Sequence, residues 1–171
     1  FVKTNQPVAA CMASQYAGWQ LSVDDFFAMG SGPMRAAYGG EERFKEIGHV
    51  EKASRIVGAL ETRQKPTAEV FEFISSKTGV KPNNITLAVA PTASAAGGGQ
   101  GVARSVETAL HKLHELGFDL ARVLSGKGSA PIPPTADDDL AAIGRTNDAV
   151  LYGARVELEV AGDDESIAEL G

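Results

Sequence analysis

The most constraining feature of this sequence is a succession of short apolar runs separated by segments with helical periodicity. Residues 55–60 and 85–90 have the composition of buried strands, and the helical segment 67–78 between them ends at Gly79. Uninterrupted apolar runs of this kind are typical of strands that are covered on both faces. Strands joined through helices predict an α/β architecture with mixed sheets and packed helices.

The rest of the chain predicts further elements of both kinds. The expected helices are 7–18, a short one from Met34, 41–47, 102–116 and 136–143. The expected strands are 19–23, 26–29, 122–124 and 149–160. In the last of these, Val156, Leu158 and Val160 alternate with charged residues, which indicates a strand with one solvated face.

Charge and cysteine content exclude several classes of protein. The chain has 16 Lys and Arg against 22 Asp and Glu, a formal charge of −6, so we expect no nucleic-acid partner. Cys11 is the single cysteine, which excludes an intrachain disulfide and fits a reducing cytoplasm. No apolar run approaches the roughly 20 residues that cross a bilayer, and no signal-peptide pattern is visible. Because the chain starts at Phe1 instead of Met, we expect it to be a fragment or a processed piece.

A glycine-rich stretch at residues 97–101 precedes the predicted helix 102–116 and invites a nucleotide-binding interpretation. The pattern fails, because Arg104 occupies the position where a dinucleotide-binding turn needs a small residue, and no Gly-Lys-Ser/Thr follows. We expect residues 91–101 to form a loop, either mobile or offering N–H groups to an anion. A hydrolase nucleophile elbow needs glycine two residues before and two residues after the serine, and neither Ser31 nor Ser94 meets this condition, which disfavours a serine hydrolase.

The predicted helix 102–116 carries two pairs of polar residues that deserve separate interpretations. His111 and His114 have a spacing that can hold a metal, but no acidic ligand lies in register, so a solvated face is the better interpretation and we expect no metal site. Arg104 and Glu107 lie opposite the apolar stripe and within reach of each other. Taken alone, such a pair is an exposed salt bridge worth about 0.3 kcal/mol.

Two polar segments near the C-terminus each allow two interpretations. The acidic run 137–139 falls in the first turn of a predicted helix, where carboxylates cap the helix or contribute to a metal or substrate site. Residues 144–148 precede an apolar run, so a turn explains them, although Arg145, Asn147 and Asp148 are also residues that line binding clefts.

Six segments, taken in order, resemble one protein family. They are 17–20, 27–33, 89–94, 103–108, 130–134 and 137–153. Together they resemble the methenyl-tetrahydromethanopterin cyclohydrolases. The resemblance implies a cytoplasmic α/β enzyme, generally a homotrimer, whose pterin one-carbon carrier is bound between two domains of each subunit. It implies no metal and no redox cofactor.

The resemblance also implies how the chain is organised. Members of the family are nearly twice as long, so we expect this chain to lack their N-terminal third and a C-terminal portion. Residues 1–50 would end a first α/β domain, and residues 51–171 would form part of a second one.

The family's catalytic Arg-x-x-Glu step matches Arg104 and Glu107. The resemblance implies that Glu107 takes a proton from water as general base, while Arg104 keeps Glu107 ionised by lowering its pKa. Candidates for binding the pterin or a nearby phosphate are Ser31, Thr92, Ser94, Arg145, Asn147 and Asp148. The alternative is a non-catalytic pterin- or nucleotide-binding module in which Arg104 and Glu107 form a surface pair. The reaction that the resemblance implies takes part both in methane formation and in the oxidation of one-carbon compounds.

Overall fold

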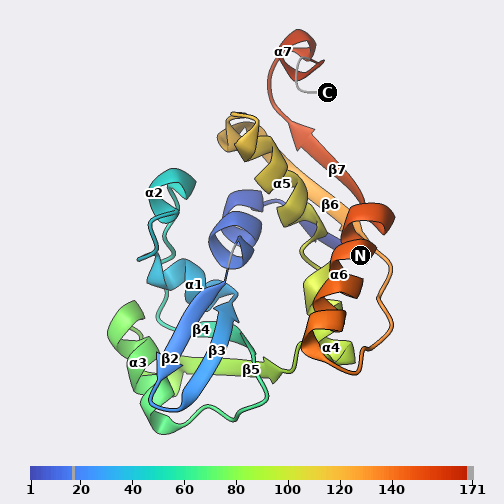
Figure 1. The fold of residues 1–171 in the computed structure, drawn as a ribbon. Coiled ribbons are helices and arrows are strands. Elements are labelled where there is room, and N and C mark those ends of the chain that lie inside the picture. Colours follow the sequence, from blue (N-terminus) through green and yellow to red (C-terminus); the bar gives the residue numbers. More distant parts are fainter. Residues whose placement is uncertain (17, 169–171) are drawn as a thin grey trace.

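The computed structural model describes residues 1–16 and 18–168 and confirms an α/β architecture with two separate sheets (Figure 1). One sheet has the order β1 (Val2–Thr4), β6 (Val123–Ser129) and β7 (Arg155–Val160), with antiparallel neighbours. The other has the order β2 (Trp19–Val23), β3 (Phe26–Ser31), β4 (Ile56–Glu61) and β5 (Ile85–Ala90). Only β4 and β5 run parallel in this second sheet.

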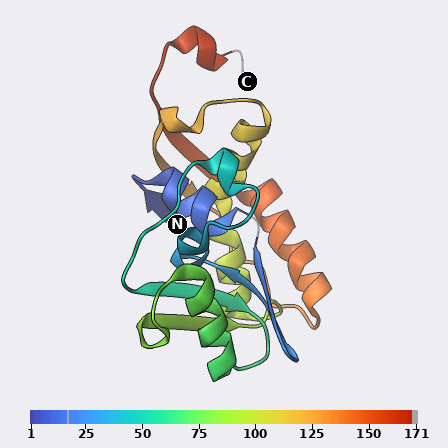
Figure 2. The ribbon, with the colours of Figure 1, turned by 90° about the vertical axis from the view of Figure 1, so that its left-hand side faces the viewer.

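Helices connect most of the strands. In chain order they are η1 (Val8–Ala13), α1 (Pro33–Tyr38), α2 (Phe44–Ile47), α3 (Ala68–Thr78), η2 (Pro82–Asn84), α4 (Ala95–Val102), α5 (Ser105–Glu115), η3 (Leu120–Arg122), α6 (Asp139–Gly153) and α7 (Asp164–Ala168). The two sheets lie toward opposite ends of the molecule with η1 and α1 between them (Figures 1 and 2). None of the described helices is long and apolar enough to span a membrane.

Two cores hold the elements together. The first forms where alternate side chains of the four-stranded sheet, such as Leu21, pack against Val70 and Ile74 of α3. The second forms where Cys11 and Met12 of η1 pack against Val106 and Leu110 of α5. The apolar stripe predicted on the long helix is therefore confirmed at its centre, whereas Leu116 is exposed beyond the end of α5.

The four-stranded sheet is covered on only one face by the residues that the structure describes. Phe27 and Val57, which point away from the first core, are each 53% exposed. The expectation that residues 55–60 and 85–90 are buried on both faces was therefore wrong. Each strand does form, because its alternate residues, including Ile56 and Leu60, supply enough apolar surface to the first core.

The glycine-rich stretch was predicted as a loop, but it forms α4. Ser94 caps this helix, and its Oγ accepts a hydrogen bond from the Gly97 N–H at 3.0 Å. Position 97 requires glycine because the backbone there lies close to the Pro91 carbonyl oxygen. A Cβ at this position would lie 2.3 Å from that oxygen. Gly97 thus serves the packing of the helix, and the low helix propensity of the glycine-rich stretch is overcome by the cap and by tertiary contacts.

The segment 144–148 was predicted as a turn and 149–153 as part of a strand, and both expectations were wrong. Both lie in α6, which starts after Asp138 and packs on α4. Asp138 Oδ1 accepts a hydrogen bond from the Ala141 N–H at 2.8 Å, so the capping interpretation of the acidic run is confirmed. The helix continues through Gly144 because its partner helix supplies contacts that local propensity does not.

The predicted helix 7–18 is present as a π-helix, η1, and its position 17 lies outside the described residues. Both sheets combine strands from the two sides of position 50, since β3 pairs with β4 and β1 pairs with β6. The division into domains 1–50 and 51–171 stays a prediction.

Candidate active site

Arg104 and Glu107 form a partly buried ion pair at the start of α5. Arg104 is the residue that precedes the helix, and Glu107 lies in its first turn. The Arg104 Nε and Nη2 groups donate to Glu107 Oε2 at 3.1 Å and 2.8 Å. The side chain of Glu107 is 4% exposed and that of Arg104 is 35% exposed. The predicted contact is present, whereas the interpretation as an exposed surface pair was wrong.

Burial controls the protonation of Glu107. It raises the pKa of the carboxyl above the ordinary value of 4.5, because the charged form loses its hydration. The charges of Arg104, His111 and Arg35 lower the pKa in part without reversing the shift. Arg104 lowers the pKa of Glu107 as expected, but burial raises it by more, and the depth of that burial could not be predicted from the spacing of the two residues. Burial and the charge of Glu107 also raise the pKa of the Cys11 thiol to about 11.

The pair borders a hollow of about 370 Å³ between α5 and α6. Asn147 and Thr146 line its α6 side, and Gly101 of α4 completes one wall. A Cβ on Gly101 would lie 2.4 Å from Thr146 Cγ2, so the glycine permits the approach of the two helices. Asn147, predicted to bind substrate, therefore lies at the same hollow as the predicted catalytic pair. Its role stays a prediction.

The other predicted substrate residues lie outside the lining of this hollow. Thr92 donates its hydroxyl to Glu61 Oε1, and Ser94 donates its hydroxyl to the Pro91 carbonyl at 2.6 Å. Ser31 ends β3 and is partly buried. Arg145 donates to the Thr135 carbonyl, and Asp148 is exposed on α6. Their predicted contacts with substrate stay predictions.

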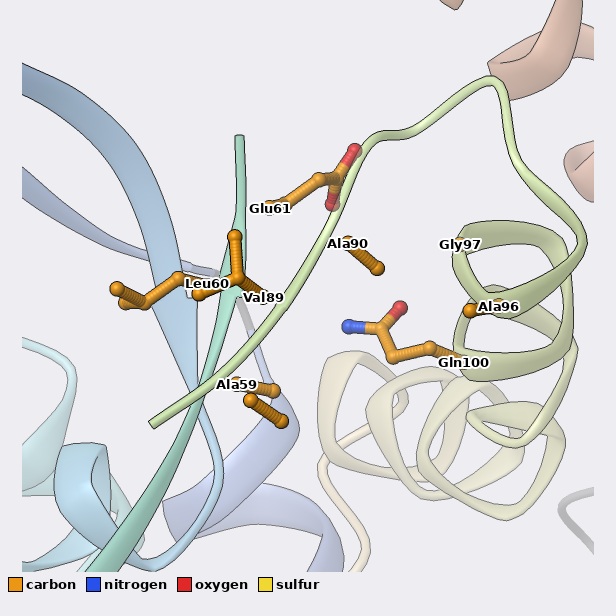
Figure 3. A pocket seen from close by; sticks show the side chains of 9 residues that line it. Ala59, Leu60, Glu61, Val89, Ala90, Ala96, Gly97 and Gln100 are labelled. Carbon is orange, nitrogen blue, oxygen red and sulfur yellow. The ribbon is translucent and has the colours of Figure 1, made fainter. Parts of the chain in front are cut away.

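Glu61 is a candidate that the sequence reasoning missed. It is the last residue of β4, and it borders a second hollow between the strands and α4 (Figure 3). A usable signal was present, because a polar residue directly after an apolar strand falls at the carboxyl end of a parallel pair, where α/β proteins bind ligands.

The two histidines of α5 have carboxylate partners. His111 Nε2 lies 3.1 Å from Glu115 Oε1, and His114 Nε2 lies 3.3 Å from Glu46 Oε2. Within residues 1–16 and 18–168, no group of three or more His, Cys, Asp or Glu side chains is placed to hold a metal ion.

Fold and site together define an α/β protein with a candidate acid–base centre. Its central group is a glutamate that is buried, paired with an arginine and placed at the wall of a hollow. A carboxylate whose pKa is raised in this way is typical of groups that exchange protons with a substrate or with water.

Comparison with known proteins agrees with this class. The sequence model of the family described as Cyclohydrolase (MCH) matches residues 1–171. Proteins called methenyltetrahydromethanopterin cyclohydrolase are 49% identical over 169 residues in Methylobacillus flagellatus and 46% identical over 170 residues in Methanosarcina barkeri. Each alignment covers 99% of this chain, and 52% and 53% of the respective relative. The chain belongs to this cyclohydrolase family, and it spans about half the length of the curated relatives it matches.

Proposed function

We propose that this chain carries the catalytic residues of an enzyme that adds water to methenyl-tetrahydromethanopterin and forms formyl-tetrahydromethanopterin, reversibly. The observation that supports it most is the buried carboxylate of Glu107, held by Arg104 at the wall of a hollow. Relatives that share close to half of its residues bear the name of this activity.

In the proposed reaction, Glu107 is the general base. The methenyl carbon lies between two nitrogens that share a positive charge, so it is electrophilic and needs only a deprotonated water. Glu107 takes one proton from water as the C–O bond forms and the neutral hydrate results. A base with a raised pKa holds this proton well and can release it again.

The hydrate then opens to the product. Its hydroxyl proton leaves to solvent, the C=O bond forms and one C–N bond breaks. Glu107 returns its proton to the nitrogen that is released. One proton is set free overall, which balances the change from a cationic substrate to a neutral product. Because the carbon keeps its oxidation state, the proposed reaction requires no redox cofactor, and we propose that it uses no metal.

Arg104 has two functions in this proposal. Its two hydrogen bonds to Oε2 fix the direction of the Glu107 carboxylate at the wall of the hollow. Its charge also stabilises the oxygen that becomes partly negative as the hydrate forms and collapses. The more exposed position of its guanidinium, relative to Glu107, suits contact with a bound substrate.

We also propose the setting in which the enzyme acts. The complete protein would be a cytoplasmic homotrimer with the pterin carrier as its substrate, and with no nucleic-acid or membrane partner. Its step would serve either methane formation or formaldehyde oxidation.

The test uses the full-length protein that contains this chain. Wild type should consume methenyl-tetrahydromethanopterin, seen as loss of the near-ultraviolet absorbance of the methenyl group. Glu107→Gln should bind the substrate with at most a small change in affinity and lose turnover by a factor on the order of 100 or more. Glu115→Gln, which changes an exposed carboxylate on the same helix, is the matched control. Full turnover by Glu107→Gln would remove the base from the mechanism.

A further inference from the structure

The helix face that carries Glu107 continues with a histidine. Arg104, Glu107 and His111 are spaced by three and four residues around the start of α5, so their side chains follow one another along one face. Glu107 therefore has a guanidinium one turn before it and an imidazole one turn after it. Arg104 donates to Glu107 and lines the hollow, whereas His111 lies outside the lining. A charge on His111 can thus act on Glu107 without contact with a bound substrate.

Tyr16 fixes the position of His111. The two ring centroids lie 4.4 Å apart, and the ring planes are tilted by 60°. Tyr16 is buried, and its N–H donates to the Cys11 and Met12 carbonyls at 3.0 Å and 3.3 Å. Arg43 donates to the phenol oxygen, and its guanidinium carbon lies 4.8 Å from the centroid of the Tyr16 ring. Backbone and side-chain contacts thus hold the ring that packs on the imidazole.

The groups whose charges act on Glu107 differ in whether they titrate near neutral pH. Arg104 and Arg35 are guanidinium groups, which stay charged in proteins. The Cys11 thiol has a pKa of about 11, so it is neutral at pH 7. A histidine side chain ordinarily takes up its proton near pH 6.5, so His111 is the one of these neighbours whose charge changes in the working range. The charge of His111 lowers the pKa of Glu107.

The second carboxylate beside His111 competes little for this charge. Glu115 Oε1 lies 3.1 Å from His111 Nε2, but the two side chains are 55% and 36% exposed, and exposed pairs of this kind contribute little. The side chain of Glu107 is only 4% exposed, so water screens its interaction with a nearby charge much less. The charge of an imidazolium at position 111 therefore reaches Glu107 with little screening.

We propose that protonated His111 is a positioning residue of the proposed reaction, because it holds the Glu107 carboxylate in the ionised form that accepts a proton from water. This inference rests on the proposed function. In that reaction Arg104 also stabilises the oxygen of the hydrate, so its charge is shared between base and substrate. His111 lies outside the hollow, so its charge stays with the base throughout the cycle.

The test compares kcat–pH profiles of the full-length enzyme from about pH 4 to about pH 8. His111→Gln should move the rising limb of kcat to higher pH by about half a pH unit, so that kcat falls about threefold on the limb and changes little on the plateau. KM should change little, because position 111 is outside the hollow. His111→Lys keeps a positive charge at every pH in this range and should bring the limb back to its wild-type position or below it. A merely structural role would instead lower kcat by the same factor at each pH.

Lys112→Gln is the matched control. It removes one positive charge from the next position of the same helix, where the side chain is 68% exposed, and it should leave the limb in place. Three results would overturn the inference: an unmoved limb in His111→Gln, a limb in His111→Lys that moves as in His111→Gln, or an equal movement in Lys112→Gln.

A measurement without turnover separates this inference from the proposed function. In full-length protein labelled with carbon-13 at the glutamate side-chain carboxyls, the Glu107 signal is identified by its loss in Glu107→Gln, and its chemical shift reports protonation. Glu107 should titrate at higher pH in His111→Gln than in wild type. Equal titration in the two proteins would overturn the inference even where wild type is active, whereas failure of the proposed function would show as folded wild-type protein without turnover.

Discussion

Arg35 and Glu41 form a two-point ion pair inside the molecule. Arg35 Nε lies 2.8 Å from Glu41 Oε1, and Nη2 lies 2.9 Å from Oε2. The same guanidinium donates through Nη1 to the carbonyls of Met12 and Ala13, at the end of η1. Arg35 is fully buried, so these four hydrogen bonds hold its charge in place. Since η1 packs on α5, the pair supports the helix that carries Glu107.

Glu41→Gln should therefore destabilise the protein by about 2 kcal/mol, because a buried guanidinium loses its charged partner. Urea denaturation of the full-length protein measures this change. Glu42→Gln is the control, since the neighbouring side chain is 92% exposed and its loss should change stability by less than about 0.5 kcal/mol. Equal effects of the two variants would contradict a structural role of the pair.

The pH dependence of kcat should follow the protonation of Glu107. A base acts in its ionised form, so activity should rise with pH through a pKa above the ordinary value of 4.5. Arg104 lowers this pKa, and Arg104→Gln should therefore move the rising limb to higher pH as well as reduce kcat. If the rising limb of the kcat–pH profile did not move in Arg104→Gln, a group other than Glu107 would be responsible for it.

Glu107 should also reduce stability at neutral pH. Its pKa is raised in the folded chain, so folding favours the protonated form. The resulting stability is present below the unfolded pKa and is lost as pH rises through the folded pKa. Glu107→Gln should thus have a higher melting temperature than wild type at pH 7, and the difference should shrink toward pH 4. Thermal melts of both proteins across this pH range check the sign.

In helix α4, the effect of Gly101→Ala on stability should depend on a single methyl group, that of Thr146. Gly101→Ala should destabilise by about 1 kcal/mol or more, because its Cβ would meet Thr146 Cγ2. In a Thr146→Ser background, which removes Cγ2, the same change should stabilise by roughly 0.5–1 kcal/mol through helix propensity.

The control for this pair of variants lies two residues away. Gly99→Ala meets no atom within 4 Å and should stabilise in either background. Denaturant unfolding of the single and double variants measures the coupling between positions 101 and 146. Additive effects at these two positions would mean that α4 and α6 are not in contact there.

Much of the fold could be predicted from local patterns. Strand β2 has the bounds expected from its apolar run, and Gly79 ends α3 in the left-handed conformation as expected. The predictions that were wrong concern segments whose structure depends on residues distant in the sequence. Helix α4 relies on the close contact of Gly97 with the Pro91 carbonyl, and α6 relies on packing against α4. Neither contact has a signature in neighbouring residues.

The candidate site was predictable in part for the same reason. The spacing of Arg104 and Glu107 on a helix predicts their contact, since it depends only on helical geometry. The burial of Glu107 depends on how η1 and β6 pack against α5, so the pKa shift could not be predicted from spacing. Glu61 follows an apolar run in the sequence, but its position beside the second hollow depends on the parallel pairing of β4 and β5 and on the placement of α4.

Strand β5 ends the order of its sheet, and in the described chain its outer edge is paired with no other strand. The backbone N–H and C=O groups of such an edge recruit strands from other molecules, and the exposed Phe27 and Val57 on the adjacent face strengthen this attraction. Preparations of this half-length chain should therefore self-associate as their concentration rises. Purification and assay are best done with the longer protein, in dilute solution and with light scattering as a check.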